Sequence, residues 1–174
     1  MAKISYNKIK NDEKKLIYEF QHNARDSLDK IAKKCGFSRQ KVLRIIKKLE
    51  KEKKIWGYSA IIDNEKFSLK RFLILIRRST EPIDDAISKI IELTLHKKGK
   101  EIDVFIEFSS YIYGRYDWML IVNAKDINSV KKFGNILEKE YRNVISEVHI
   151  MEELFSVTKN GITNPNLEKL RDFI

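Results

Sequence analysis

One segment near the N-terminus constrains the fold more than any other, because it places two opposite surfaces on a single helix. Residues 39–53 read RQKVLRIIKKLEKEK. Apolar residues recur at helical spacing along one side: Val42, Ile45, Ile46 and Leu49. Basic residues cluster roughly 150° away on the same helical wheel: Lys41, Arg44, Lys48 and Lys51. Such a helix buries one side against its neighbours and exposes a cationic stripe on the other.

The residues before this segment predict two further helices. Asn11, followed by two acids, is typical of a helix start, and it predicts a helix over 11–23. Ser27 predicts the cap of a short second helix that ends at Gly36, and Ser38 predicts the cap of the third helix. A short helix, a glycine-containing turn and a second, basic helix form the helix-turn-helix arrangement. The β-prone residues 55–63 predict either a pair of wing strands or a single strand that leaves this domain.

The charge distribution indicates that this basic region contacts nucleic acid. Residues 1–63 hold 17 Lys+Arg against 8 Asp+Glu, whereas the rest of the chain holds 18 against 17. A generally lysine-rich composition would explain abundant lysines in both parts. It would not explain why only the second part balances them with acids. A basic module beside a neutral one is typical of a DNA-binding protein.

The recognition helix of a helix-turn-helix lies in the major groove of double-stranded DNA, and its first residues reach the bases. Here those residues are Ser38, Arg39, Gln40, Lys41 and Arg44. Because Arg pairs with guanine and Gln with adenine through two hydrogen bonds, Arg39, Gln40 and Arg44 are the predicted readout residues. Three lysines are predicted to contact phosphates: Lys47, Lys48 and Lys51. The alternative for any single lysine is a solvated helix face.

The second part of the chain predicts a β-α-β-β-α-β order, and hence an α+β fold. The predicted strands cover 71–78, 102–109, 116–124 and 144–151, and the predicted helices cover 80–95 and 126–141, with a turn at 97–100. The first of these helices is expected to bury Ile83, Ile87, Ile90, Ile91 and Leu95. This order is the ferredoxin-like plan, in which two helices cover one face of an antiparallel sheet. The other face is rich in Phe and Ile, which predicts a dimer.

The expected domain bounds follow from these patterns. Residues 1–63 form the winged helix-turn-helix domain, 64–70 the linker and 71–156 the ferredoxin-like domain. Residues 157–174 form a C-terminal tail, in which Asn164-Pro165-Asn166 is expected to precede a last short helix.

Several classes of function are disfavoured by what the chain lacks. Glycine-rich phosphate loops and nucleophile motifs are absent, so we expect neither an enzyme nor a bound cofactor. The single Cys35 is expected to be a small buried residue, and the three histidines lack zinc-site spacing. No apolar run is long enough for a signal peptide or a membrane span. We therefore expect a cytoplasmic protein.

With both parts described, the chain resembles the Lrp/AsnC (feast/famine) transcriptional regulators over roughly residues 11–156. The first block of resemblance is the recognition helix and the segment after it, with Ser38, Val42, Ile45, Leu49, Ile55, Gly57, Tyr58, Ala60, Ile62 and Asp63 at the family's positions. The second block is GRYDWMLIV, which is similar to the G-x-Y-D strand start of the family through Gly114, Tyr116 and Asp117.

The resemblance implies a sequence-specific regulator with a winged helix-turn-helix and a regulatory domain. It implies homodimers that often assemble into tetramers or octamers. It also implies an amino acid or similar effector near the loop with Gly114, Arg115, Tyr116 and Asp117. Arg115 departs from the family, which often has an acid there. The main alternative is a sirohaem decarboxylase of the same two-domain architecture, for which Arg115 and His149 are the candidate residues.

Overall fold

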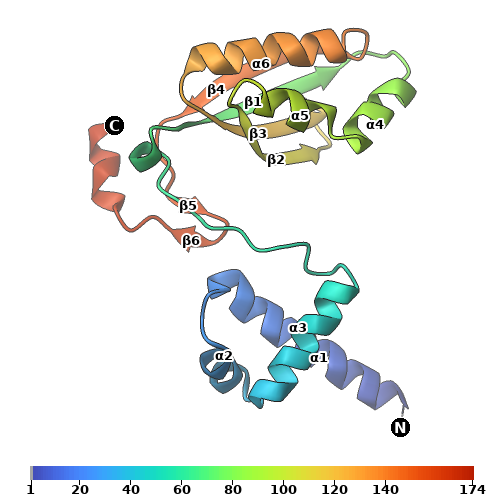
Figure 1. Cartoon of the computed structure of the whole chain (residues 1–174), viewed down its shortest axis with the longest axis vertical. Coiled ribbons are helices and arrows are strands. Elements are labelled where there is room, and N and C mark those ends of the chain that lie inside the picture. The colour runs from blue at the N-terminus through green and yellow to red at the C-terminus, as the bar shows by residue number, and fades with distance from the viewer. Residues whose placement is uncertain (1) are drawn as a thin grey trace. The chain divides into compact units, whose positions relative to one another are not determined.

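The computed structural model describes residues 2–174, with side chains described from Ile9 onward. Figure 1 labels the helices and strands along the chain. By its internal contacts the chain divides into two units. The first comprises the residues up to Ile61 together with Val157–Lys169, and the second comprises Ile62–Ser156 together with Leu170–Ile174.

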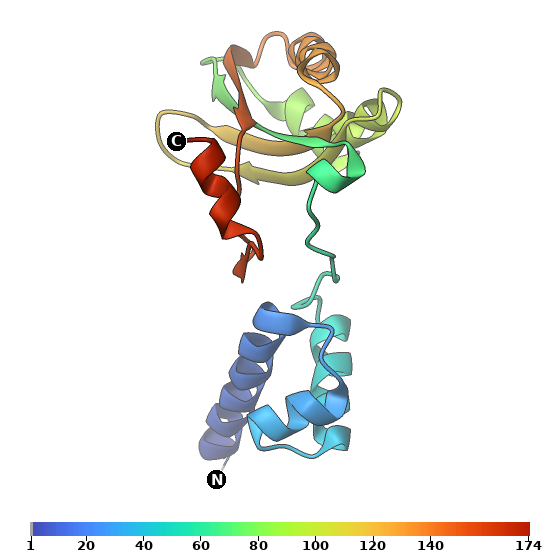
Figure 2. The ribbon, with the colours of Figure 1, turned by 90° about the vertical axis from the view of Figure 1, so that its left-hand side faces the viewer.

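The first unit, which we call the helical unit, contains three helices in addition to the tail residues: α1 (Ala2–Asn23), α2 (Leu28–Cys35) and α3 (Arg39–Lys51). The predicted caps are confirmed, because the Ser27 hydroxyl accepts a hydrogen bond from the Lys30 amide and the Ser38 hydroxyl accepts one from the Lys41 amide. Gly36 ends α2 at φ 71°, a left-handed conformation that glycine adopts without strain. Figure 2 shows the three helices packed against one another.

The core of this unit comes from the predicted apolar faces. Its buried residues are Leu16 of α1, Ile31, Ala32 and Cys35 of α2, and Val42, Ile45, Ile46 and Leu49 of α3. Cys35 is buried as expected, and burial raises the pKa of its thiol. The apolar side of residues 39–51 therefore faces inward, which fixes the direction in which the basic side points.

Two predictions for this unit are wrong. The first helix begins at Ala2 and not at Asn11, because residues 2–10 contain no Gly or Pro to end the helix and the acids after Asn11 serve other partners. The predicted wing or exit strand is also absent, since residues 55–63 of the described chain have no regular secondary structure. The chain after α3 is an extended connector.

The second unit has the predicted order of elements. A 3₁₀ turn, η1 (Glu65–Phe67), precedes β1 (Lys70–Arg78), α4 (Asp84–Ile91), α5 (Thr94–Lys100), β2 (Phe105–Tyr111), β3 (Trp118–Ala124), α6 (Ile127–Glu140) and β4 (Ile145–Glu153). The strands form an antiparallel sheet in the order β2-β3-β1-β4. Helices α4, α5 and α6 lie on one face of this sheet (Figures 1 and 2). The predicted ferredoxin-like plan is confirmed.

Alternation along the strands separates the two faces of the sheet. On β1, Phe72, Ile74 and Ile76 are buried under the helices. The residues between them lie on the opposite face, which we call the open face. Its apolar residues are Leu73, Leu75, Phe105, Phe108, Met119, Ile121 and Met151. Phe108 and Met151 are both more than 40% exposed, so within one chain this apolar surface is only partly covered.

The first helix of this unit differs from its prediction. The expected continuous helix breaks at Glu92–Leu93, where Leu93 adopts φ 56°, and the expected turn at 97–100 belongs to α5. Before the break, α4 packs on the core through Ile83, Ala86 and Ile90, so Ile87 and Ile91 are exposed. After it, Leu95 of α5 is buried as predicted.

The C-terminal tail contains structure that the sequence patterns did not predict. A short hairpin joins β5 (Thr158–Lys159) to β6 (Ile162–Thr163), and the chain continues into a 3₁₀ helix, η2 (Leu167–Asp172). The expected last short helix is thus present in 3₁₀ form. Within the described part of the chain, no helix is long and apolar enough to cross a membrane.

Candidate nucleic-acid interface

The candidate interface is the solvent side of α3. Gln40, Arg44, Lys47 and Lys51 are all exposed there, opposite the buried apolar face. No carboxylate among the described residues pairs with Arg44, Lys47 or Lys51. These three cations and the Gln40 amide therefore form the part of the helix surface that is available to an anionic ligand.

The flank of α3 next to α1 is different, because acids of α1 neutralise it. Asp12 pairs with Lys41 at 2.7 Å, and Glu13 pairs with Lys48 at 2.6 Å. Glu13 also accepts a hydrogen bond from Lys54 at 3.2 Å. Lys41 and Lys48, which the sequence placed among the DNA contacts, are thus engaged within the protein. Lys41 in addition lies over the Phe37 ring, 3.9 Å from its centroid.

Glu13 is the site residue that the sequence patterns missed. It is only 9% exposed, and the hydrogen bond from Lys48 holds the pKa of its carboxyl below the usual value. Its position gave a signal, because Glu13 stands three residues before Leu16 and seven before Phe20, on the apolar stripe of α1. An acid on such a stripe is expected to have a cationic partner from a packed neighbour.

Two predicted contacts at the start of α3 also have internal partners. The Ser38 hydroxyl caps the helix, and Arg39 pairs with Asp29 of α2 at 3.4 Å. Both side chains of the Arg39–Asp29 pair are about two-thirds exposed, so water competes with this ion pair. Arg39 can therefore exchange its partner more easily than Lys48.

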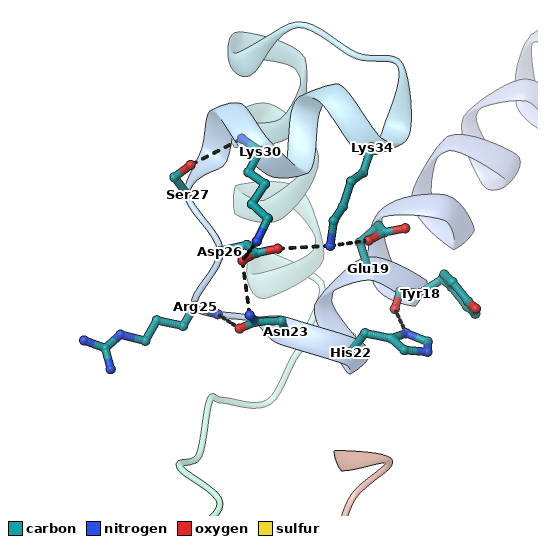
Figure 3. A network of polar contacts seen from close by, with 9 residues as sticks. All are labelled: Tyr18, Glu19, His22, Asn23, Arg25, Asp26, Ser27, Lys30 and Lys34. Carbon is teal, nitrogen blue, oxygen red and sulfur yellow. Dashed lines mark hydrogen bonds and ion pairs between the residues drawn. The ribbon is translucent and has the colours of Figure 1, made fainter. Parts of the chain in front are cut away.

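A second network fixes α2 to the loop before it (Figure 3). Asp26 accepts hydrogen bonds from Lys30 at 2.8 Å and Lys34 at 3.0 Å, and Lys34 also pairs with Glu19 at 3.2 Å. Asn23 connects the end of α1 to this network through its amide, which donates to Asp26 at 3.1 Å. The network holds the helix that supports α3.

The predicted effector residues all lie in the connection between β2 and β3, with Asp117 directly before β3. Arg115 is exposed, and its guanidinium lies 5.8 Å from the centroid of the Tyr116 ring. The Asp117 carboxylate accepts a hydrogen bond from the Arg78 amide at 2.8 Å, so it holds the end of β1. Gly114 lies in the same connection, and a Cβ added to it would meet nothing within 4 Å.

The structure brings the decarboxylase candidates near one another. The rings of Tyr116 and His149 meet edge to face at 5.5 Å, and the Arg115 charge acts on Glu147. The Nε2 atom of His149 forms a hydrogen bond with a carboxylate oxygen of Glu147 at 2.5 Å. This hydrogen bond, with the charges of Arg115 and Arg77, lowers the pKa of Glu147. Arg115, Tyr116, Glu147 and His149 therefore form one cluster.

Comparison with known proteins agrees with both units. Residues 13–55 match a family model described as winged helix-turn-helix DNA-binding. Uncharacterized HTH-type transcriptional regulators of Pyrococcus furiosus and Pyrococcus abyssi are 24% and 26% identical to the chain. The alignments cover 85% and 84% of this chain and 92% of each relative.

Solved structures share the fold. A regulator from Neisseria meningitidis, in complex with L-Met, superposes with a TM-score of 0.65 at 18% identity, over 90% of this chain and 97% of its own. Bacillus subtilis LrpC superposes with a TM-score of 0.58 at 20% identity, over 84% and 95%. An AsnC family regulator from Agrobacterium tumefaciens superposes with a TM-score of 0.57 at 19% identity, over 91% and 97%.

Residues 13–55 thus match a winged helix-turn-helix model, and the chain has the fold of Lrp/AsnC regulators. The resemblance to Lrp/AsnC regulators that the sequence predicted is confirmed. Helix α3, with its exposed basic side, lies within the segment that matches the helix-turn-helix model.

We predict that Glu13→Gln destabilises the helical unit at neutral pH by about 1 kcal/mol, because the charge-assisted hydrogen bonds from Lys48 and Lys54 are weakened. A carboxylate whose pKa is lowered by folding stabilises the protein above its unfolded pKa, and this contribution is lost as the pH falls through the folded pKa. The difference between the variant and the wild type should therefore disappear in acid. Hydrogen exchange of the buried α3 amides, from pH 7 to pH 3, measures it.

The matched control is Glu52→Gln, which removes a more exposed carboxylate that pairs with the same two lysines. We expect little change in this variant, since exposed ion pairs contribute about 0–1 kcal/mol. Equal effects of the two substitutions at every pH would contradict the role given to Glu13.

Proposed function

We propose that the protein is a sequence-specific, DNA-binding transcriptional regulator that acts as a dimer or higher oligomer and responds to an amino acid or similar small molecule. The observation that carries the proposal is the exposed surface of α3, with cations that no described acid neutralises. A binding surface for polyanions of this kind has no role in a decarboxylase. We place its action in the cytoplasm, where promoter DNA and amino acids are both available to it.

Within this surface the residues have different proposed roles. Gln40 and Arg44 contact bases, because both lie toward the start of α3 and both can form paired hydrogen bonds with a base edge. Arg39 joins them when it leaves Asp29. Lys47 and Lys51 contact phosphates, which position the helix without reading sequence. Lys41 and Lys48, held by acids of α1, support the helix.

We predict different consequences for the two kinds of contact. Arg44→Ala should relax the sequence preference at one position, at a cost of about 1–3 kcal/mol on the preferred site. Lys51→Ala should weaken binding to all sequences alike and reduce the slope of log affinity against log salt by about one. The preferred site is first selected from random DNA, and fluorescence titrations then measure affinity between about 50 and 200 mM salt, where the wild type should lose about 10³–10⁵.

Lys132→Ala is the matched control, because Lys132 is an exposed lysine of α6 in the other unit. It should leave affinity and salt slope unchanged. A wild-type affinity that does not respond to salt would refute DNA binding through this surface. Identical sequence profiles for Arg44→Ala and Lys51→Ala would refute the assigned orientation of α3.

The proposed dimer forms through the open face of the sheet. A second copy of the chain would cover Leu73, Leu75 and the exposed side chains of Phe108 and Met151, and it would place two DNA-reading helices in one particle. Contiguous apolar surface of this kind on a sheet is typical of an interaction site.

We predict that Leu75→Glu converts the dimer into a monomer, because the new carboxylate would be buried without a partner in the centre of the interface. Light scattering after size exclusion should give twice the 20.6 kDa chain mass for the wild type and the single mass for the variant. Ile91→Glu is the control, since Ile91 is 75% exposed on α4, which lies on the opposite face. Loss of the dimer in both variants, or in neither, would contradict the proposed interface.

The proposed effector site is the connection with Gly114, Arg115, Tyr116 and Asp117. Two solved structures with the same fold contain an amino acid: the Neisseria regulator in complex with L-Met and a Mycobacterium tuberculosis feast or famine regulatory protein complexed with L-Methionine. The Asp117 carboxylate already accepts a hydrogen bond from the Arg78 amide. We therefore assign the exposed guanidinium of Arg115 as the group that binds the carboxylate of an amino acid.

We predict that at least one of the twenty amino acids raises the melting temperature of the wild type, since a ligand that binds the native state stabilises it. L-Met is the first to test. Arg115→Ala should remove most of this shift, and Arg142→Ala, an exposed arginine after α6, should retain it. A shift that persists in Arg115→Ala would contradict the assigned site, and no shift with any amino acid would contradict the ligand class.

A further inference from the structure

A row of polar side chains crosses one end of the open face and contains residues from all four strands. Arg71 of β1 lies directly opposite Asn123 of β3 on one side and opposite Glu153 of β4 on the other. Glu107, at the register shift of β2 between Ile106 and Phe108, joins them through hydrogen bonds from Arg71 and Asn123. We call Arg71, Glu107, Asn123 and Glu153, with Asn64 and Ser156, the Arg71 network.

Arg71 makes ion pairs in both directions along the row. Its Nε and Nη2 atoms donate to the two oxygens of Glu107, each at 2.9 Å, and its Nη1 donates to Glu153. The paired geometry with Glu107 is the arrangement in which arginine binds a carboxylate most strongly. Only 14% of the Arg71 side chain is exposed, so water competes weakly with these contacts. The row is thus a rigid part of the sheet.

The first connection from the row leads to the segment before β1. Asn123 donates to Glu107 at 3.0 Å and accepts from the side-chain amide of Asn64 at 2.6 Å. Both asparagines are 8% exposed. The Asn64 carbonyl in turn accepts from the amides of Phe67 and Leu69, each at 3.0 Å. Asn64 therefore holds residues 64–69 in place, close to the point at which the chain enters the sheet unit at Ile62.

The second connection leads to the segment after β4. The Ser156 hydroxyl donates to Glu153, which is also an acceptor for Arg71. Ser156 is the last residue before the chain returns to the helical unit at Val157. Two of the three places where the chain passes between the units, at 61–62 and 156–157, thus lie within two residues of a member of the Arg71 network.

We propose that Arg71 is a positioning residue for DNA binding, which acts by holding both of these connecting segments to the sheet. Within each chain, these are two of the three segments that connect the DNA-binding unit to the sheet unit. Holding their ends restricts the volume that each unit explores, and a restricted volume raises the effective concentration of the second unit once the first has bound. The network therefore favours DNA with two half-sites and has no effect on a single half-site. This inference rests on the proposed dimeric regulator.

The test compares two DNA duplexes, one with the complete site selected by the wild type and one in which half of that site is randomised. Arg71→Met keeps the length and apolar contact of the side chain but removes its ion pairs. Its affinity for the complete site should fall on the order of tenfold, a part of the 10²–10⁴ that linking two binding units provides. Its affinity for the half-site should stay within roughly twofold of the wild type.

Further variants separate this role from folding. Asn64→Ala removes one connection and leaves both ion pairs of Arg71 in place, so it tests the inference even if Arg71→Met does not fold. Arg71→Lys, which keeps the charge and loses the paired geometry, should be intermediate. Lys70→Met is the matched control, because the exposed Lys70–Glu152 pair joins the same two strands one residue away. It should leave both affinities unchanged.

The affinities for the two duplexes distinguish failure of this inference from failure of the proposed function. An unchanged ratio of complete-site to half-site affinity in the folded variants overturns the inference, and a lower ratio in Arg71→Met and Asn64→Ala supports it. A wild type that binds neither duplex refutes the proposed function instead. In that case hydrogen exchange still decides, since Arg71→Met must speed exchange of the amides at 62–69 and 154–157. Unchanged exchange there would overturn the role of the network.

Discussion

The burial of one face of α3 is the constraint on which the proposed DNA-binding surface depends. Val42, Ile46 and Leu49 are almost completely enclosed by α1 and α2, so the helix cannot rotate about its axis without exposing apolar surface. That orientation determines which side chains face solvent. Because a rotation by one residue position is about 100°, a different register of the apolar face would direct another set of lysines outward.

If only the apolar packing of α3 mattered, all the basic residues on its solvent side would be unpaired cations. The acids of α1 reduce their number, because Asp12 and Glu13 pair with Lys41 and Lys48 along the flank nearest to α1. A nearly buried carboxylate requires such partners, since an unpaired charge in that position would be costly. The same interactions that hold α3 against α1 therefore concentrate the unpaired charge at Arg44, Lys47 and Lys51. The ion pairs that stabilise the packing of α3 on α1 thus also set the limits of the proposed recognition surface.

The sequence predicted correctly those structural features that depend on neighbouring residues alone. The serine caps at 27 and 38, the glycine at 36 and the alternation of β1 all follow from local chemistry, and each is present. It was insufficient where partners distant in the chain decide. Asp12 and Glu13 are typical of a helix start, but in the fold they pair with Lys41 and Lys48. Ile87 and Ile91 match a core stripe, but α4 packs on the sheet through Ile83, Ala86 and Ile90 instead. The β-prone residues 55–63 form no strand, because β propensity alone supplies no partner strand.

The open face combines an apolar centre with two polar ends that differ in kind. At one end the Arg71 network satisfies its charges internally and connects to Asn64 and Ser156, so a partner that covers the face need supply no counter-charge there. At the other end His149, Glu147 and Tyr116 lie beside Arg115, whose charge is exposed and accessible. Charged side chains that a protein partner covers must already have counter-charges, whereas a site for a charged ligand needs a charged side chain that can still bind it. The division of polar residues between the two ends thus matches the two roles that we propose for this sheet, assembly and effector binding.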